Sequence, residues 1–388
     1  MVQSEVNMAL VLTKFCRSLL HEPVKRVFCG VFHPGFIESC VGAKRHLLSE
    51  DVIKLQDFQR RKLAVAHLAT GTEGNFIELF HQKLQRKELI LRDELKLLLH
   101  LCQSADDMMI ARDAIQRYHM ENCNLLYGDF KFGPLFMRLC YELGLEDMAA
   151  NTLADDNLKG FFIDTTSFNI AIDMLFIKGL YEEALEVVKT MRNQSVPFNK
   201  ETVMLATATC YKLDSAESYR ISSILIEEEQ TRGNFISRLC YCFAVALALR
   251  RNDLKKAQSV FGQIMSTESI ICQNLKVILL VMSGDVEDAI SVLSSAMSTK
   301  TPDFVKKTEF SQEVVDLLLL RSDGKPTQGK VEQTVALLNQ NGQVTQQTLD
   351  DLLCRTPTGR RKQAPMKMGE RRISRRTGQP LQTFLISE

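Results

Sequence analysis

One stretch of 35 residues, from 165 to 199, most constrains the fold of this chain, because its pattern recurs with a fixed period. Gly144 and Ala149 lie 35 residues before Gly179 and Ala184, in the same frame. A fixed period of this length is typical of a solenoid, in which each unit buries its apolar face only against neighbouring units. The sequence therefore predicts an elongated, all-α array of helix pairs.

The unit itself predicts two helices that are separated by a glycine. Residues 168–177 are apolar on nearly every side, so the first helix should be buried between neighbours. Gly179 can adopt the left-handed conformation that closes a helix without a Cβ penalty. Residues 181–191 then follow an amphipathic pattern, and the small side chain of Ala184 suits the point where two helices cross. The pattern thus favours a helix-turn-helix unit.

This unit resembles the pentatricopeptide repeat. The residues that carry the resemblance are Phe168-Asn169, Gly179, Ala184-Leu185, Met191 and the closing Pro197-Phe198-Asn199. The resemblance implies a right-handed α-solenoid of helix-turn-helix repeats. Tetratricopeptide repeats are the competing interpretation, but they run at about 34 residues and their pattern includes Trp. This chain contains no Trp.

The period divides the chain into five expected parts. The repeats are clearest at 130–164 and 165–199, and the spacing drifts further along the chain. Solenoids need capping elements at their open ends, which gives the flanking helices a role. The expected parts are a transit or disordered segment at 1–48, N-terminal helices at 49–91, about six repeats at 92–303, C-terminal capping helices at 304–354 and a basic, disordered tail at 355–388.

The first 48 residues contain a short basic amphipathic stretch, ALVLTKFCRSLL. This stretch is compatible with a mitochondrial transit peptide, although Glu5 and Glu22 are atypical of one. Lys14 interrupts the apolar run too early for a secretory signal. The longest apolar run, at 239–249, has eleven residues and is too short to cross a bilayer. We therefore expect a soluble chain with no membrane span.

Positive charge gathers in the tail, although the formal net charge of the whole chain is only +1. Such clusters bind phosphates in many proteins, and they also occur in solvated, disordered ends. The sequence leaves both interpretations open. The candidate phosphate-binding residues are Arg360, Arg361, Lys362, Arg371, Arg372, Arg375 and Arg376.

The sequence carries no complete motif for catalysis or for metal binding. His119-Met120-Glu121 matches half of a zinc deaminase motif, but the Pro-Cys-x-x-Cys half is absent. Phosphate loops of the Gly-x-x-x-x-Gly-Lys type and Gly-x-Ser-x-Gly elbows are also absent. The eleven cysteines include no Cys-x-x-Cys pair and are interpreted as reduced, small apolar residues. We expect no enzyme, no cofactor and no metal site.

The resemblance also implies which residues contact RNA. In pentatricopeptide repeats each unit faces one base of single-stranded RNA; positions five and last read the base, and position two packs on it. In the clearest unit these are Asn169, Asn199 and Thr166, while Asp164 and Asn234 close the neighbouring units. An amide presents a donor and an acceptor together, as reading a splayed base requires. The pair of asparagines implies a pyrimidine, and Thr166 departs from the usual valine.

The neighbouring units fit this scheme less well. Position five is Pro134 in one neighbour and Met204 in the other, and neither side chain can donate a hydrogen bond. Specific binding would then need the tail, a partner protein or a larger ribonucleoprotein.

Two functions stay open at this point. The segments TSFNIAIDMLFIKG and CFAVALAL are similar to mitochondrial members of the family. That similarity implies a monomeric protein of the mitochondrial matrix that binds single-stranded RNA and supports the respiratory chain. It would assist the processing, maturation or stability of a mitochondrial mRNA, and a separate nuclease or ribonucleoprotein would do the cutting. In the alternative, the array is a protein-interaction scaffold in mitochondria, and Asn169 and Asn199 only cap and tie turns.

Overall fold

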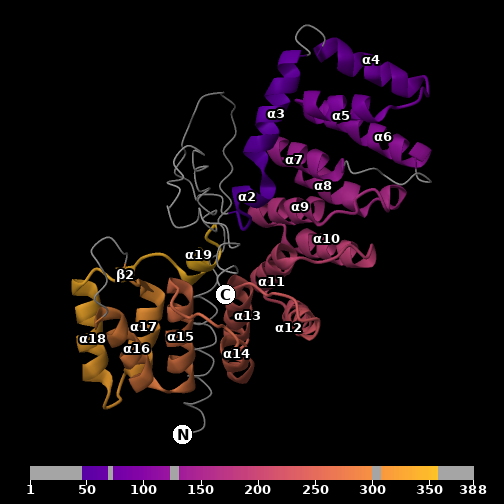
Figure 1. The fold of residues 1–388 in the computed structure, drawn as a ribbon. Helices are drawn as coiled ribbons and strands as arrows, with labels where there is room; N and C mark the ends of the chain where they lie inside the picture. Colours follow the sequence, from indigo (N-terminus) through magenta and orange to yellow (C-terminus); the bar gives the residue numbers. More distant parts are fainter. Residues whose placement is uncertain (1–45, 69–72, 123–130, 299–306, 357–388) are drawn as a thin grey trace, which may run out of the picture. The chain divides into compact units, whose positions relative to one another are not determined.

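The computed structural model describes residues 46–68, 73–122, 131–298 and 307–356. Within these ranges the chain is almost entirely helical, and Figure 1 shows the helices following one another in chain order. The exceptions in regular structure are a one-turn helix, η1 (Asp156–Leu158), and two short strands, β1 (Phe310–Ser311) and β2 (Val344–Thr345), which pair in parallel. The predicted all-α class is confirmed.

Seven pairs of consecutive helices make up most of the described chain. The first helix of each pair also packs on the first helix of the next pair, which gives a continuous stack of first helices. This stacking of neighbours is the arrangement of a helical repeat array. The pairs are α5 (Arg92–Leu101) with α6 (Ala105–Asn122), α7 (Gly133–Leu143) with α8 (Glu146–Ala154), α9 (Thr165–Lys178) with α10 (Tyr181–Asn193), α11 (Lys200–Leu213) with α12 (Ala216–Thr231), α13 (Arg238–Arg250) with α14 (Leu254–Phe261), α15 (Ile270–Ser283) with α16 (Val286–Ser298), and α17 (Gln312–Ser322) with α18 (Gln328–Gln340).

The first six pairs lie inside the expected repeat region at 92–303. The seventh pair, α17 and α18, lies in the segment expected to cap the array. However, α17 packs on α15 and α18 packs on α16, so this pair continues the contacts that join earlier pairs. The stack therefore runs one pair beyond the expected repeats before α19 (Leu349–Leu353) ends the described helices.

Three helices precede the first pair: α2 (Glu50–Ile53), α3 (Leu55–Leu68) and α4 (Glu73–Gln85). Helix α3 packs on α5 and on α7, and α2 packs on α9. In Figure 1, α3 and α2 lie beside these helices of the stack. The N-terminal helices thus cover part of the first helices of three successive pairs.

A buried carboxylate fixes the chain just before α2. Leu47 and Leu48 are fully buried, and their backbone N–H groups donate to Oδ1 of Asp173 in α9, at 2.9 and 3.3 Å. Asp173 has no exposed surface, and its burial raises the pKa of the carboxyl. The folded body therefore begins before residue 48, while the rest of the predicted transit segment, at 1–45, lies outside the described residues.

Helix α9 shows why the sequence pattern gives this packing. Every residue from Ser167 to Phe176 is buried, as expected for a helix that is enclosed by neighbours. Gly179 ends the helix with a φ of 82°, and its N–H donates to the carbonyls of Leu175 and Phe176. None of the described helices is long and apolar enough to cross a lipid bilayer.

The C-terminal helix α19 returns to the middle of the array. Asp350 in α19 pairs with Lys212 at the end of α11, with 2.5 Å between Oδ2 and Nζ. Arg250 at the end of α13 lies over the ring of Tyr211, 3.8 Å from its centroid, and donates to the Tyr211 carbonyl at 2.7 Å. Oδ1 of Asp350 also lies 3.9 Å from Nη2 of Arg250, and this contact, the pair with Lys212 and packing on α13 and α15 hold α19 against the stack.

Candidate nucleic-acid interface

Asn169 lies one turn into α9 and is only 1% exposed. Its Nδ2 donates to Oδ1 of Asn199 at 3.2 Å, and its Oδ1 accepts a hydrogen bond from the hydroxyl of Thr202 at 2.7 Å. Both polar ends of the amide therefore have a partner on the first turn of α11. Asn169 ties one helix of the stack to the start of the next.

Asn199 is exposed and is the N-cap of α11. Its Oδ1 accepts hydrogen bonds from the backbone N–H of Thr202 at 2.8 Å and from the Thr202 hydroxyl at 2.9 Å. Such a bond satisfies one of the unpaired N–H groups at a helix start. Within the described part of the chain, the side-chain hydrogen bonds of Asn199 all fall on Oδ1. Its Nδ2 can therefore donate to a ligand while the cap stays intact.

The other predicted contacts divide between core and surface. Asp164 is 7% exposed and caps α9, since its carboxylate accepts the backbone N–H of Ser167 at 2.8 Å. Burial raises the pKa of this carboxyl. Thr166 is half-buried, and Asn234 is exposed with its Nδ2 donating to Oε2 of Glu229 at 2.9 Å. Asn199, Thr166 and Asn234 are thus the three of this set that a strand could reach.

A base contact by Asn169 stays a prediction, and the geometry sets a condition on it. Because Asn169 is only 1% exposed and both ends of its amide already bind the start of α11, a base could reach it only if this junction opened and broke a hydrogen bond. Leaving a buried polar group without its partner costs about 1–3 kcal/mol. Asn199 is therefore the better placed of the two to touch RNA.

The same junction recurs further along the stack, at a residue that the sequence interpretation missed. Asn274 in α15 is fully buried; its Nδ2 donates to the carbonyls of Ile270 at 2.7 Å and Glu309 at 3.0 Å. Its Oδ1 accepts the backbone N–H of Ser311 at 2.8 Å, directly before α17. Asn274 thus joins α15 to the start of α17.

A signal in the sequence could have found this second asparagine. Asn169 follows the N-cap of its helix, Asp164, by five residues, and Asn274 follows its N-cap, Ser269, by five as well. In these two helices the residue five after the N-cap lies at the junction with the next first helix.

Between these two asparagines, apolar and sulfur side chains fill the same position. In α11 the residue five after the N-cap is Met204, which is buried. In α13 it is Cys242, whose Sγ lies 3.6 Å from that of Cys272 in α15. The hydrogen bond to Cys272 and burial both raise the pKa of the Cys242 thiol. From α9 to α15 position five is therefore buried at a junction whether or not its side chain can read a base, whereas its equivalents Lys96 in α5 and Asp316 in α17 are exposed.

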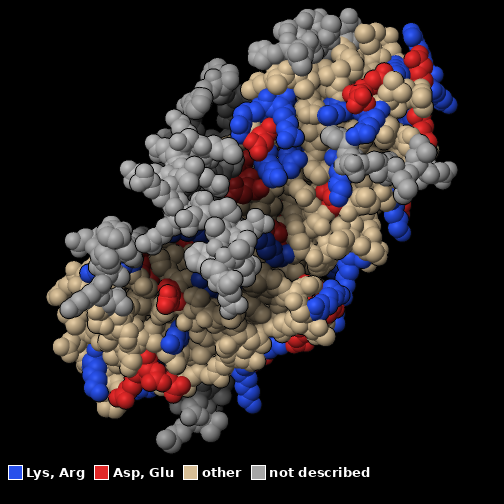
Figure 2. All heavy atoms as spheres, in the orientation of Figure 1, with Lys and Arg blue, Asp and Glu red and all other residues tan. Residues whose placement is uncertain are grey.

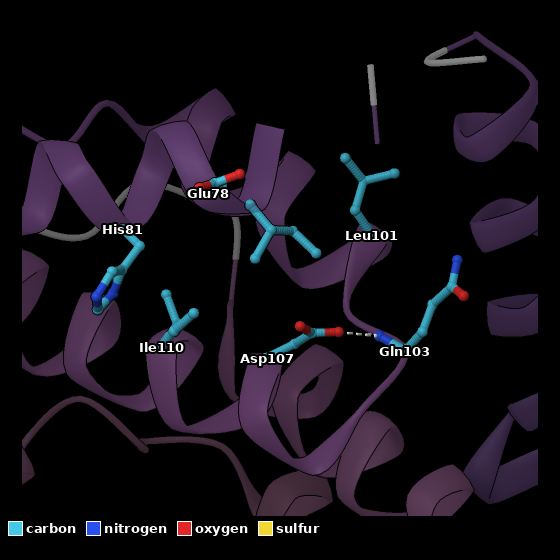
Figure 3. A pocket seen from close by; sticks show the side chains of 7 residues that line it. Glu78, His81, Leu101, Gln103, Asp107 and Ile110 are labelled. Atoms are coloured by element: carbon cyan, nitrogen blue, oxygen red, sulfur yellow. Dashed lines mark hydrogen bonds between the residues drawn. The ribbon is translucent and has the colours of Figure 1, made fainter. Parts of the chain in front are cut away.

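A cleft also lies near the N-terminal end of the described residues, between α4, α5 and α6 (Figure 3). Its volume is about 480 Å³. The carboxylate of Asp107 is engaged there, because Oδ2 accepts the backbone N–H groups of Gln103 at 2.8 Å and Ser104 at 2.9 Å. Across the described ranges, no three His, Cys, Asp or Glu side chains are grouped so that they could hold a metal ion. The cleft is lined by Ile77, Glu78, His81, Leu101, Gln103, Asp107 and Ile110.

The basic tail lies outside the described residues from position 357 onward. The predicted phosphate contacts in it therefore stay predictions. They are Arg360, Arg361, Lys362, Arg371, Arg372, Arg375 and Arg376.

Comparison with known proteins gives matches that extend over the whole helix array. A family model described as Mitochondrial 28S ribosomal protein S27 matches residues 24–353. A relative from Danio rerio, named Pentatricopeptide repeat-containing protein 2, mitochondrial, is 50% identical over 362 residues, which cover 93% of this chain and 94% of the relative. The relative of the same name from Homo sapiens is 45% identical over 386 residues, covering 98% and 99%. A crystal structure of a pentatricopeptide repeat protein from maize overlaps with a TM-score of 0.37 at 14% identity, covering 74% of this chain and 44% of that chain.

Proposed function

The chain belongs to the family of mitochondrial pentatricopeptide repeat-containing protein 2, within the family described as Mitochondrial 28S ribosomal protein S27, and we propose that it binds single-stranded mitochondrial RNA. In this proposal it acts in the matrix and assists the processing, maturation or stability of an mRNA, and so supports the respiratory chain. It does not cut RNA itself, and a separate nuclease or ribonucleoprotein acts on the bound transcript.

The observation that carries the proposal is the exposed amide of Asn199. Its carbonyl oxygen is held by Asn169 and Thr202, so its Nδ2 has a defined place at the start of α11. A donor held in this way loses little conformational entropy when it binds, which favours reading a base edge. The name of the matching family model, a ribosomal protein, is consistent with binding of RNA within a larger ribonucleoprotein.

The protein-interaction scaffold stays as the second candidate function, and two observations favour it. Asn169 and Asn274 both serve as ties between helices, which explains these asparagines without RNA. In addition, α2 and α3 cover part of the first helices of three pairs, the helices that carry the base-reading positions in pentatricopeptide repeats. A scaffold would use the remaining helix surfaces for proteins.

The test changes Asn199 without removing its cap. Serine is as good an N-cap as asparagine, so Asn199→Ser should keep α11 intact while it removes the amide donor. Asn193→Ser is the matched control, because Asn193 is also exposed but lies at the end of α10, a second helix of its pair. Both variants and the wild type are expressed in mitochondria and cross-linked to RNA with ultraviolet light. Each protein is then purified, and the RNA attached to it is sequenced.

We expect a defined RNA footprint for the wild type and the control, and a weaker footprint for Asn199→Ser. A footprint that is the same in all three would remove Asn199 from the reading site. No enrichment of RNA with the wild type would favour the scaffold and direct the search to protein partners.

A further inference from the structure

Positive side chains gather on α3 and on the adjoining part of α5. Figure 2 shows Lys and Arg side chains crowded over the region where α3 lies in Figure 1. The formal net charge of the chain is only +1, yet four cations at 54–62, on α3 and the residue before it, and one on α5 gather here. We call them the α3 cationic surface: Lys54, Arg60, Arg61, Lys62 and Lys96.

The packing of α3 on α5 fixes where these charges lie. Phe58 of α3 is 4% exposed and packs against His100 of α5, with 6.2 Å between the ring centroids. Burial lowers the pKa of His100, and the charges of Lys96, Arg61 and Lys62 lower it further. Cations from both helices therefore act on one place.

The acidic residues of this region neutralise only part of the charge. Asp57 pairs with Arg60 on the same helix, and Glu142 of α7 pairs with Lys62, with 2.9 Å between Oε2 and Nζ. Lys54 and Arg61 are both exposed, and neither forms an ion pair with another described residue. Glu50 and Asp51 of α2 are also exposed, close to Lys54 in the chain, so four carboxylates stand against the five cations and a small net positive charge remains.

Arg138 of α7 extends this charge below the surface. It is half-buried, and its Nε donates to the carbonyl of Ile53 at 2.6 Å, which ties α7 to the end of α2. Burial lowers the pKa of Arg138, the carboxylates of Asp164, Glu50 and Asp57 raise it, and the charge of Arg61 lowers it. Arg138 therefore lies among charges of both signs.

We propose that the α3 cationic surface binds the phosphates of single-stranded RNA, so that this end of the array holds a strand by its backbone and not by its bases. This inference rests on the proposed function. Phosphate contacts position a nucleic acid without reading its sequence, and arginine forks and lysine ammonium groups suit them. The side chains five after the N-cap at Asn169, Met204, Cys242 and Asn274 are buried, and the equivalent residue of α5, Lys96, is exposed and cationic, which favours backbone contact at this end of the array.

The arrangement of helices favours RNA over an acidic protein as the occupant. Helix α3 packs on α5 and α7, and α7 packs on α9, whose junction with α11 carries Asn199. The cationic surface and the exposed amide thus belong to the same stack of first helices. A single strand could be held by phosphates at one and by a base at the other.

The test removes three of the charges from the full chain: Arg60→Gln, Arg61→Gln and Lys96→Gln together. Binding of labelled oligouridylate and of labelled oligoadenylate is measured by fluorescence anisotropy over a series of potassium chloride concentrations. The matched control loses three exposed cations that lie on other helices: Lys189→Gln, Arg220→Gln and Lys330→Gln. Far-ultraviolet circular dichroism confirms that each variant keeps its helices.

We expect the α3 variant to bind both oligonucleotides about tenfold more weakly than the wild type near physiological salt. The slope of log affinity against log salt should become shallower by about two, since each lost contact with a single strand removes about 0.7. The control should stay close to the wild type in both quantities.

The possible failures point to different causes. If the wild type binds neither oligonucleotide at any salt concentration, the proposed RNA-binding function itself fails. If the wild type binds and the α3 variant matches the control, RNA binding stands and this surface is overturned as its site. A loss confined to oligouridylate would also overturn the inference, because phosphate contacts do not distinguish the two bases.

Discussion

The junction between α9 and α11 and the junction between α13 and α15 occupy equivalent places in the array but use different chemistry. In the first, the amide of Asn169 exchanges hydrogen bonds with Asn199 and Thr202. In the second, the thiol of Cys242 lies 3.6 Å from that of Cys272. Both position-five side chains are buried. At these two junctions the position requires a side chain that fits between the helices, so an asparagine there is not by itself evidence of base reading.

The junction between α15 and α17 is more polar than either of these two. Asn274 has no exposed surface and makes three hydrogen bonds to backbone groups, one of which holds Ser311 before α17. The more buried backbone groups a junction residue satisfies, the more its removal should cost. The junctions can therefore be ranked by experiment.

The largest effect is expected from Asn274→Ala. The substitution leaves the buried N–H of Ser311 and the partly buried carbonyl of Glu309 without this partner, so we expect a loss of about 3 kcal/mol in the free energy of unfolding. Urea unfolding followed by circular dichroism measures the loss. Asn193→Ala at an exposed site is the control and should change stability far less. Equal losses in the two variants would show that the junction at α17 carries no special weight.

A smaller effect is expected from Asn169→Ala in the α9–α11 junction. Thr202 loses one hydrogen-bond acceptor but keeps the other, Oδ1 of Asn199, at 2.9 Å. We expect a loss of about 1–2 kcal/mol by the same urea measurement. A loss as large as that of Asn274→Ala would mean that Asn199 cannot satisfy Thr202 alone, and the ranking of the two polar junctions would be wrong.

The local parts of these junctions could be predicted from the sequence, because helices and their ends depend on neighbouring residues. The apolar run before Gly179 and the amphipathic run after it predicted α9 and α10, and Gly179 has the left-handed φ of 82° that its place implied. The same local logic makes Asn199 an N-cap, which the sequence interpretation held open as the alternative to base reading.

The partners across the junctions could not be predicted, since they depend on how helices pack. Asn169 and Thr202 are 33 positions apart, and Asp173 is 126 positions from Leu47, whose N–H it accepts. A local pattern can mark one member of such a pair, but none identifies its partner. The extra pair α17 and α18 was expected only as a cap, because its sequence lacks the glycine and alanine spacing of the clear units. The RNA-contact residues stay predictions. Asn169 is buried and Asn199 is exposed, so the two differ in how easily RNA could reach them.

A third junction, between α7 and α9, allows a test by pH. Asp164 caps α9 from a buried position, and burial raises the pKa of its carboxyl above that of the unfolded chain. The folded protein therefore holds this proton more tightly than the unfolded chain does. The stabilisation is complete below the unfolded-state pKa, near pH 4, and is lost as the pH rises through the raised pKa.

Asn is an equally good cap that cannot ionise, so Asp164→Asn should remove this pH dependence. We expect the variant to match or exceed the wild type in stability at neutral pH and to lose its advantage below about pH 4. Urea midpoints measured from acid to neutral pH provide the comparison. A wild type that gains stability over the variant as the pH rises would show that the hydrogen bonds from Ser167 outweigh burial.

The smallest effect is expected from Cys242→Ala, which removes one of the two sulfur atoms from the junction between α13 and α15. Thiols are weak hydrogen-bond donors that pack like small apolar residues, so the loss should be below about 1 kcal/mol and below that of Asn169→Ala. A double-mutant cycle with Cys272→Ala measures the coupling between the two sulfurs, which should then be close to zero. A loss larger than that of Asn169→Ala would contradict the expected ranking of the junctions. It would mean that the contact between Cys242 and Cys272 stabilises the stack more than the amide network does, and that hydrogen-bond chemistry does not order these junctions.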